Sequence, residues 1–420
     1  MKNLVLILAA FLFFASSCKK TKGTISMTYE KAIAVYGDID AIRALPLLTT
    51  KQPVENPSKI FIGDNYILVG EEGKGIHIFD NSNMTNPQRL SFIQIPYNKE
   101  FYVKGNILYA ESLYDVIKVD ISNVYNPTLI ARAINIFGSP KTNDKGESLL
   151  GFNYVMATDN FELDSPEAKE LKKKGKIHLD YLDKLIPDAE IPATFTSTSS
   201  DVSSMNRIAV STNTVYFLTG NRLHILDDHG SSISDARTIN LSDGMETVYT
   251  EGNRLYIGSE DNMIIYNITQ PNNPSRISDY NHTNSCDPVM PHNDVAYLTL
   301  RDSENSGCNS LGENTLNVID LSDETEPTLI QSIDMVSPYG VTLIGYYLFV
   351  GEGENGMAIF NATNPKNLVE IKRITNVTAF DIMLHPTNPN IILVTNNNGL
   401  EQFTINYNTL DLTPLSTIDY

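Results

Sequence analysis

The sequence has 420 residues, with 50 acidic against 31 basic side chains and a net charge of −19. A chain of this length can form two or three ordinary domains or one large all-β domain. Nucleic-acid backbones are bound by clustered lysine and arginine, so this acidic balance predicts no nucleic-acid partner.

The N-terminus has the pattern of an export signal. Lys2 precedes an apolar run at residues 4–14, which is too short to span a bilayer and indicates a signal peptide at residues 1–17. The small residues before Cys18 resemble a bacterial lipobox of the Bacteroidetes type, which implies a lipid anchor on Cys18 in the outer membrane. No acidic run follows Cys18, which favours the periplasmic side over the cell surface. The alternative is an ordinary signal peptide in which Cys18 is incidental.

Short β-rich hairpins recur along the chain. Copies lie at residues 66–80, 108–120, 215–227, 255–267, 296–320, 347–361 and 392–404. Their ends are spaced by about 40 residues, with about 67 extra residues in one step and about 13 in another. A further strand on each side of the hairpin gives four strands per repeat, which is the pattern of a propeller blade.

These repeats predict an all-β fold, a seven-bladed β-propeller at residues 58–420, with residues 18–57 as a tether and N-terminal leader. The longest step is a partly helical insertion between blades at residues 139–204. An eight-bladed propeller is the alternative, if this step contains a degenerate blade around residues 151–157.

Aspartate or asparagine closes most of the hairpins, at Asp80, Asp120, Asp227, Asn267, Asp320 and Asn361, with Thr404 in the last copy. Such a side chain can accept hydrogen bonds from the N–H groups of the following turn. Prolines follow seven residues later at positions 87, 127, 274 and 327, where they stop strand pairing. We expect structural roles here, because the alternating Asp/Asn loops of calcium sites are missing.

The second hairpin strand and its tail resemble the LVIVD repeat, in residues 75–87, 116–127 and 316–327. That repeat is known from bacterial and archaeal cell-surface and secreted proteins, and it implies a β-propeller. The resemblance brings no catalytic motif and implies an interaction protein of the cell surface or periplasm.

Loop lengths predict one elaborated end of the propeller. Turns between the second and third strands share an end with the connections between blades, and both the 139–204 insertion and the long turn after Leu300 fall there. The acidic residues expected on this binding face are Glu71, Glu72, Glu260, Asp261, Glu352 and Glu354. Within the insertion, Ser165, Pro166 and Gly175 predict a capped helix. The insertion is either a lid or docking arm, or a tolerated surface loop.

Cysteine and histidine residues suggest two further features. Cys286 and Cys308 should meet at the elaborated end, where a disulfide suits an exported protein. A metal site is conceivable at His282, Asp287, His292 and Asp294, but the spacing matches no metal motif and two prolines predict a turn. We expect no cofactor.

We therefore expect a non-catalytic envelope lipoprotein whose propeller face binds a protein or glycan partner. The alternative is a propeller-fold envelope enzyme that acts on polysaccharide or peptide. Its catalytic carboxylate pair could be hidden among the 50 acids, where spacing does not locate it.

Overall fold

The computed structural model describes residues 23–187, 206–242, 244–259, 261–282, 289–302 and 314–419. These residues form 32 strands and two short helices, so the fold is all-β. Two compact units are present: a larger one with seven antiparallel sheets, and a smaller one built from residues 23–36 and 149–187. Neither helix in the described part of the chain has both the length and the apolar character needed to cross a bilayer.

Each of the seven sheets contains four strands that follow one another in the chain, and we number the sheets in chain order. The first three sheets are β3 (Pro57–Ile62), β4 (Tyr66–Glu71), β5 (Gly75–Asp80) and β6 (Gln88–Gln94); β7 (Phe101–Lys104), β8 (Ile107–Ser112), β9 (Asp115–Asp120) and β10 (Thr128–Ala133); and β13 (Ile208–Ser211), β14 (Thr214–Thr219), β15 (Arg222–Asp228) and β16 (Ile233–Asn240). The next two are β17 (Met245–Glu251), β18 (Arg254–Ser259), β19 (Asn262–Asn267) and β20 (Ser275–Asn281); and β21 (Val289–His292), β22 (Val295–Leu300), β23 (Thr315–Asp320) and β24 (Thr328–Asp334). The last two are β25 (Val341–Ile344), β26 (Tyr347–Gly351), β27 (Met357–Asn361) and β28 (Val369–Ile374); and β29 (Ile382–Leu384), β30 (Ile391–Asn396), β31 (Gly399–Asn406) and β32 (Asp411–Asp419).

The two middle strands of a sheet are buried on both faces. In the first sheet, residues 67–71 of β4 and 75–79 of β5 are all buried. Near-continuous apolar runs are what such strands require, because neighbouring sheets cover both of their faces. Each sheet therefore depends on a partner sheet on either side.

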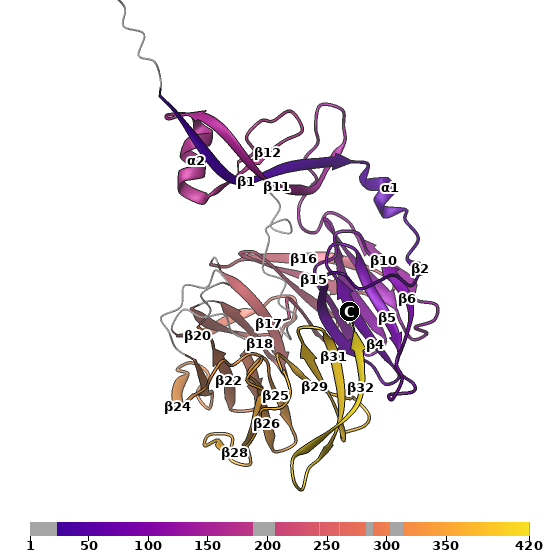
Figure 1. Ribbon diagram of the computed structural model, residues 1–420, viewed down its shortest axis with the longest axis vertical. Helices are drawn as coiled ribbons and strands as arrows, with labels where there is room; N and C mark the ends of the chain where they lie inside the picture. Colours follow the sequence, from indigo (N-terminus) through magenta and orange to yellow (C-terminus); the bar gives the residue numbers. More distant parts are fainter. Residues whose placement is uncertain are drawn as a thin grey trace, which may run out of the picture. The chain divides into compact units, whose positions relative to one another are not determined.

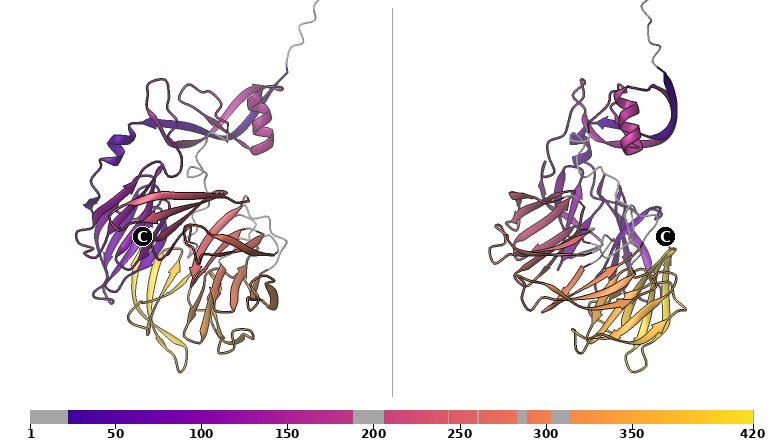
Figure 2. Two further views of the ribbon diagram at one scale, coloured as in Figure 1. Left: turned by 180° about the vertical axis from the view of Figure 1, so that it is seen from behind. Right: turned by 90° about the vertical axis from the view of Figure 1, so that its left-hand side faces the viewer.

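Hydrophobic clusters join each sheet to the next, and the seventh sheet packs against the first. In this last cluster Ile67 of the first sheet meets Leu393 of the seventh. Beside it, the buried side-chain amides of Asn81 and Gln402 exchange hydrogen bonds of 3.0 and 2.9 Å. The sheets thus form a closed, propeller-like arrangement, which can be followed in Figure 1 and Figure 2.

The predicted hydrogen bonds at the strand ends are confirmed in five sheets. The side-chain oxygens of Asp80, Asp120, Asn267, Asp320 and Asn361 each accept a bond of 2.8 or 2.9 Å from the N–H two residues later. In the third and seventh sheets the third strand runs on, and the bond is made by Asp228 and Asn406 instead of Asp227 and Thr404. The repeated aspartate or asparagine therefore marks the end of the third strand.

The fourth strand of each sheet, which we call the outer strand, contains a β-bulge. Its pairing with the third strand shifts register once in all seven sheets. Bulges add twist and protect exposed edges from pairing with other chains. The first sheet has additional cover from β2 (Leu48–Thr50), a leader strand that pairs antiparallel with β6.

The smaller unit combines the leader with the insertion. Its three-stranded sheet has the order β11 (Ser148–Glu162), β1 (Thr24–Gly37) and β12 (Lys176–Leu179), with β1 and β12 parallel. The predicted helix is present as α2 (Pro166–Lys174), capped by Ser165 and by Gly175 in the left-handed conformation. Leu171 of α2 packs with Tyr29 of β1. The described part of the insertion is thus paired with leader residues in one sheet.

Two glycines in the turn between β4 and β5 provide a test of the fold. Both have positive φ, but a Cβ on Gly75 would lie 2.0 Å from the carbonyl oxygen of Ile93, whereas one on Gly73 would meet nothing within 4 Å. We expect Gly75→Ala to lower the free energy of unfolding by at least about 2 kcal/mol more than Gly73→Ala. Urea denaturation of both variants measures the difference. Equal losses would contradict the close approach.

Candidate functional site

The acidic residues predicted for the binding face have different environments. Glu71 and Glu352 occupy equivalent positions in the first and sixth sheets, and both are buried. Glu71 accepts hydrogen bonds from the backbone N–H groups of Glu55 (3.0 Å) and Asn56 (2.8 Å) and lies 3.0 Å from Nε2 of buried His77. Burial raises the pKa of Glu71, but these hydrogen bonds outweigh it and hold the pKa below its usual value.

Glu352 has the same role in the sixth sheet. Its carboxylate accepts a 2.7 Å hydrogen bond from the backbone N–H of Val336 and forms an ion pair with Arg373. Both glutamates therefore satisfy backbone groups of the segment that leads into the first strand of their sheet. Contrary to the expectation from sequence, the carboxylates of Glu71 and Glu352 are internal and are not displayed on an exposed face.

The other acidic turn residues are more accessible. Asp261 and Glu354 are exposed, and Glu72 is half-buried and accepts a 2.9 Å hydrogen bond from the side-chain amide of Asn56. Glu260 lies outside the described residues. Exposed negative charge at these turns therefore comes from a smaller set of side chains than predicted.

The structure describes only some of the residues predicted to form a lipid anchor, a disulfide or a metal site. Outside the described residues lie Cys18, Cys286, Asp287 and Cys308, so the anchor and the disulfide remain predictions. His282, His292 and Asp294 are described, and Nε2 of His292 lies 2.8 Å from the side-chain nitrogen of Asn293. Within the described ranges, no three His, Cys, Asp or Glu side chains are placed to hold one metal ion.

A group of polar side chains that the sequence prediction missed gathers at the first and second strands of three sheets. We call Lys59, Lys99, Glu100, Glu111, Asn206 and Arg207 the inner polar cluster. Lys59 of β3 forms a 2.7 Å ion pair with Glu100, which directly precedes β7, and donates a hydrogen bond to the side-chain oxygen of Asn206, two residues before β13. One ammonium group therefore links the first, second and third sheets, in an ion pair whose side chains are only 10% and 11% exposed.

Glu111 of β8 is the least satisfied member of the inner polar cluster. It is 6% exposed, and its Oε1 has no hydrogen-bond partner among the described residues. Burial raises the pKa of Glu111 to about 7, while the positive charges of Lys99 and Arg207 oppose the rise and the negative charge of Glu100 adds to it. The side-chain amide of Asn98 donates to the backbone carbonyls of Glu100 (2.9 Å) and Glu111 (3.0 Å), which fixes the two segments together.

The inner polar cluster combines a carboxyl group that can exchange a proton near neutral pH with nearby cations. Burial lowers the pKa of Lys99, whereas the charges of Glu111 and Glu72 favour its ammonium form. Perturbed titratable groups of this kind are typical of binding and catalytic sites. In the sequence, a charge beside or within an apolar strand, as at Lys59 and Glu111, was the signal that could have drawn attention to them.

A second buried ion pair, between Lys118 and Asp228, has hydrogen-bond partners for both of its carboxylate oxygens. Lys118 of β9 lies 2.6 Å from Asp228 of β15, and the hydroxyl of Tyr109 donates a 2.5 Å hydrogen bond to the same carboxylate. Asp228 also accepts from the N–H of Gly230. Both carboxylate oxygens have partners here, so this group connects the second and third sheets as a structural element.

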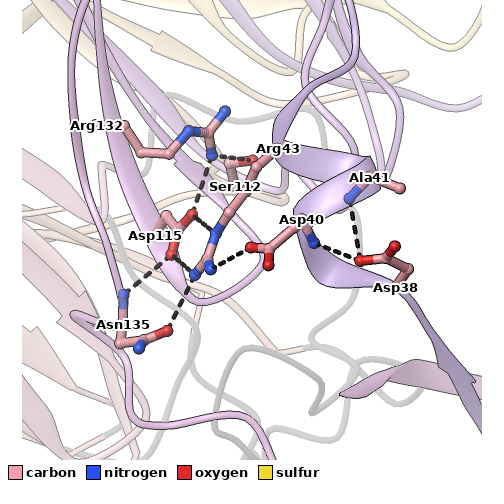
Figure 3. Close-up of polar contacts among 8 residues, drawn as sticks. All are labelled: Asp38, Asp40, Ala41, Arg43, Ser112, Asp115, Arg132 and Asn135. Carbon is pink, nitrogen blue, oxygen red and sulfur yellow. Dashed lines mark hydrogen bonds and ion pairs between the residues drawn. The ribbon is translucent and has the colours of Figure 1, made fainter. Parts of the chain in front are cut away.

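The leader is fixed to the second sheet by a third polar group (Figure 3). Arg43 of α1 (Ile39–Arg43) donates two hydrogen bonds, of 2.8 and 2.7 Å, to the carboxylate of Asp115 at the start of β9. Arg132 and the backbone N–H of Asn135 donate to the same carboxylate, at 3.1 and 3.0 Å. Asp115 therefore holds together the leader helix, the turn after β8 and the end of β10.

An open pocket of about 580 Å³ lies where the first and seventh sheets meet. Phe79, Arg89 and Ile418 are among its lining residues, and the guanidinium of Arg89 stands 5.5 Å over the ring of Phe79. These residues belong to the third and fourth strands of their sheets, whereas the inner polar cluster lies at the first and second strands. The pocket is therefore separate from the cluster.

Comparison with known proteins supports the repeat and the fold. Residues 310–335 match the LVIVD repeat, and the described part of this segment contains β23, the Asp320 turn and β24. The chain is similar to a solved protein from Lactobacillus plantarum, with 13% identity, a TM-score of 0.50, and coverage of 94% of this chain and 97% of that one. Sqt1 from Saccharomyces cerevisiae gives 8% identity, a TM-score of 0.50, and coverage of 89% and 88%. No curated protein matches the sequence.

Removal of the carboxylate of Asp115 should destabilise the larger unit. Two arginines and a backbone N–H would lose a largely buried acceptor, so we expect Asp115→Ala to lower the free energy of unfolding by about 3 kcal/mol. Asp323→Ala is the matched control, since in the described part of the chain the carboxylate of this exposed aspartate bonds only within its own turn, and the change should cost less than about 1 kcal/mol. Urea titrations that gave equal losses would show that the leader contact is dispensable.

Burial of Glu111 predicts a pH dependence of stability. Its pKa is about 7 in the folded chain and close to 4.5 when unfolded, so the folded state binds more protons between these values and stability falls as pH rises. The contribution is about 3 kcal/mol between pH 4.5 and pH 7. Urea denaturation at several pH values measures how the free energy of unfolding changes with pH. Glu111→Gln should reduce this pH dependence, whereas Glu72→Gln should leave it unchanged. The same pH dependence in Glu111→Gln and in the unmodified chain would contradict a buried, protonated Glu111.

Proposed function

We propose that this chain is a lipid-anchored lipoprotein of the cell envelope whose seven-bladed propeller binds a glycan or protein partner without transforming it. Seven sheets with seven linking clusters, the last of which joins the seventh sheet to the first, support seven blades. Residues 149–187, where an eighth blade was the alternative, pair with the leader in the smaller unit, which also favours seven.

The observation that carries the binding proposal is the inner polar cluster. Lys99, Glu100, Asn206 and Arg207 lie in the connections that precede first strands, at the end of the sheets from which the 139–204 insertion departs. Buried charges and an unmatched carboxylate oxygen lower stability unless another group satisfies them. A ligand that enters from this end would supply that group.

Location rests on the N-terminal sequence. A lipid on Cys18 would attach the folded part to the outer membrane, and the absence of an acidic run after Cys18 favours the periplasmic side. The disulfide between Cys286 and Cys308 belongs to the same proposal, because oxidising compartments permit it.

One observation favours the second candidate function, an envelope enzyme acting on polysaccharide or peptide. A carboxyl group with a pKa of about 7, such as that of Glu111, is suited to general acid catalysis. Glu100, the carboxylate whose charge raises the pKa of Glu111, is already paired with Lys59, so a second catalytic group would have to come from elsewhere. We therefore place binding first.

The proposal predicts saturable binding without product when the purified mature chain is presented with envelope glycans and peptides. Calorimetry measures binding, and chromatography of the incubated ligands measures turnover; any turnover would reject a non-catalytic role. Glu354→Gln should weaken binding several-fold if the exposed turns contact the partner. Glu326→Gln, an equal charge change at the turns of the opposite end, is the control and should have no effect. In cells, Cys18→Ser should move the protein out of the membrane fraction.

A further inference from the structure

We infer that the pocket between the first and seventh sheets binds a monocarboxylate with an apolar body, whose carboxylate group pairs with the guanidinium of Arg89. This site is separate from the inner polar cluster, so the inference goes beyond the proposed function and does not depend on it. We call it the junction pocket; its walls are residues 51–53, Phe79, Pro87, Arg89 and residues 417–419. All of them belong to the larger unit.

The leader builds one wall of the junction pocket. β2 pairs antiparallel with β6, where Thr50 lies opposite Ser91, and residues 51–53 follow directly. The carbonyl oxygen of Gln52 accepts a 2.9 Å hydrogen bond from Nη1 of Arg89, which holds this segment against the start of β6. In the described part of the chain, the first of the seven sheets is the one with a fifth strand. The pocket therefore depends on a feature that the repeat itself lacks.

Arg89 is a half-buried cation that has no ion-pair partner among the described residues. Its bond to Gln52 is the one hydrogen bond that this part of the chain accepts from its guanidinium, and its Nε is buried without a partner. A guanidinium has five N–H donors, and its removal from water costs free energy unless an anion pairs with it. A ligand carboxylate in the pocket would supply that anion.

The fourth sheet has an arginine at the equivalent position, together with its own counter-charge. Arg276 lies beside the bulge of β20, at the position that Arg89 has in β6. Nη2 of Arg276 is 3.0 Å from Oδ1 of Asp279, three residues later in the chain. After Arg89 the corresponding residue is Phe92, which offers no charge. An acid thus neutralises the arginine of the fourth sheet, while the arginine that lines the junction pocket is left without one.

The charges of the lining favour a monoanion. Lys51 is a second, exposed cation of the pocket, and Asp419 is an exposed carboxylate. Two cations, Arg89 and Lys51, against one carboxylate leave the lining with a net charge of +1. Arginine pairs strongly with both carboxylates and phosphates, but the negative charge of Asp419 opposes a doubly charged phosphate more than a singly charged carboxylate.

Apolar side chains form much of the remaining lining. Phe79 and Ile418 are 3% and 4% exposed, and Pro53 and Pro87 lie in the same pocket. A volume of about 580 Å³ is typical of small-molecule sites, which combine apolar walls with a few polar groups that fix the orientation of the ligand. An aromatic or aliphatic acid can therefore place its body against these walls while its carboxylate meets Arg89.

A ligand-observed NMR titration with sodium 3-phenylpropionate as the probe tests the inference on the purified mature chain. The neutral amide 3-phenylpropanamide is the uncharged control, and acetate is the carboxylate without an apolar body. We expect 3-phenylpropionate to bind at least about tenfold more tightly than either, because only this compound uses both the cation and the apolar walls.

Three variants locate the site. Arg89→Met should weaken binding of 3-phenylpropionate at least about tenfold, since it removes the pairing charge and keeps the length of the side chain. Arg276→Met is the matched control in the fourth sheet and should leave the affinity unchanged. Asp419→Asn should strengthen binding about threefold, because it removes a negative charge from the lining. Such a gain in affinity cannot result from a failure to fold.

Several outcomes would overturn the inference. Equal binding of the amide would exclude carboxylate recognition, and equal binding of acetate would exclude a role for the apolar walls. Tighter binding of inorganic phosphate than of 3-phenylpropionate would assign the pocket to a phosphate group. Equal losses in Arg89→Met and Arg276→Met would show a general charge effect instead of a site. If Arg89→Met failed to fold, unchanged or weaker binding in Asp419→Asn would still reject the junction pocket.

Discussion

Contact between the seventh sheet and the first is the constraint on which the rest of the larger unit depends. A sheet whose middle strands are apolar on both faces cannot be stable with one face open, so a linear row of such sheets would expose two faces at its ends. The packing of Ile67 against Leu393, with the buried Asn81–Gln402 pair beside it, removes both ends at once. The approximate equality of the repeats follows from this requirement, because each sheet must fit between two others.

Closure also explains where polar groups collect. Segments that pass from one sheet to the next have backbone N–H groups without strand partners, and Glu71, Asp115 and Glu352 satisfy them from the adjacent turns. Each of these carboxylates has at least one backbone or charged partner, as Asp228 has. Glu111 lies near the same connections and has a buried oxygen without a hydrogen-bond partner among the described residues, a property that it shares with Glu352. Glu352 is paired with Arg373, whereas burial raises the pKa of Glu111 to about 7, so its raised pKa distinguishes Glu111 from the structural acids more clearly than hydrogen bonding alone.

Local structure could be predicted from the sequence, whereas contacts between residues far apart in the chain could not. The hairpin period, the turn-closing Asp320 and the helix after Ser165 each depend on residues a few positions apart, so the sequence contains the whole signal. Pairing of β1 with β11 and β12 joins residues more than 100 positions apart, and the same is true of Lys59 and Asn206. Two acidic turns were misjudged for a related reason, since the burial of Glu71 and Glu352 is decided by the connecting segments that lie over them.

The leader changes how the insertion-side end should be understood. Arg43 attaches the leader to Asp115 at the start of β9, only a few residues along the chain from Glu111 at the end of β8. The same leader continues into β2, which pairs with β6 at the outer edge of the first sheet, while Lys59 lies on β3 at the opposite edge of that sheet. The sequence predicted these leader residues as a tether. In the structure they are bonded to the two sheets that supply Lys59, Glu100 and Glu111. Because the leader contacts the same sheets that supply Lys59, Glu100 and Glu111, the geometry of the inner polar cluster depends in part on these leader contacts.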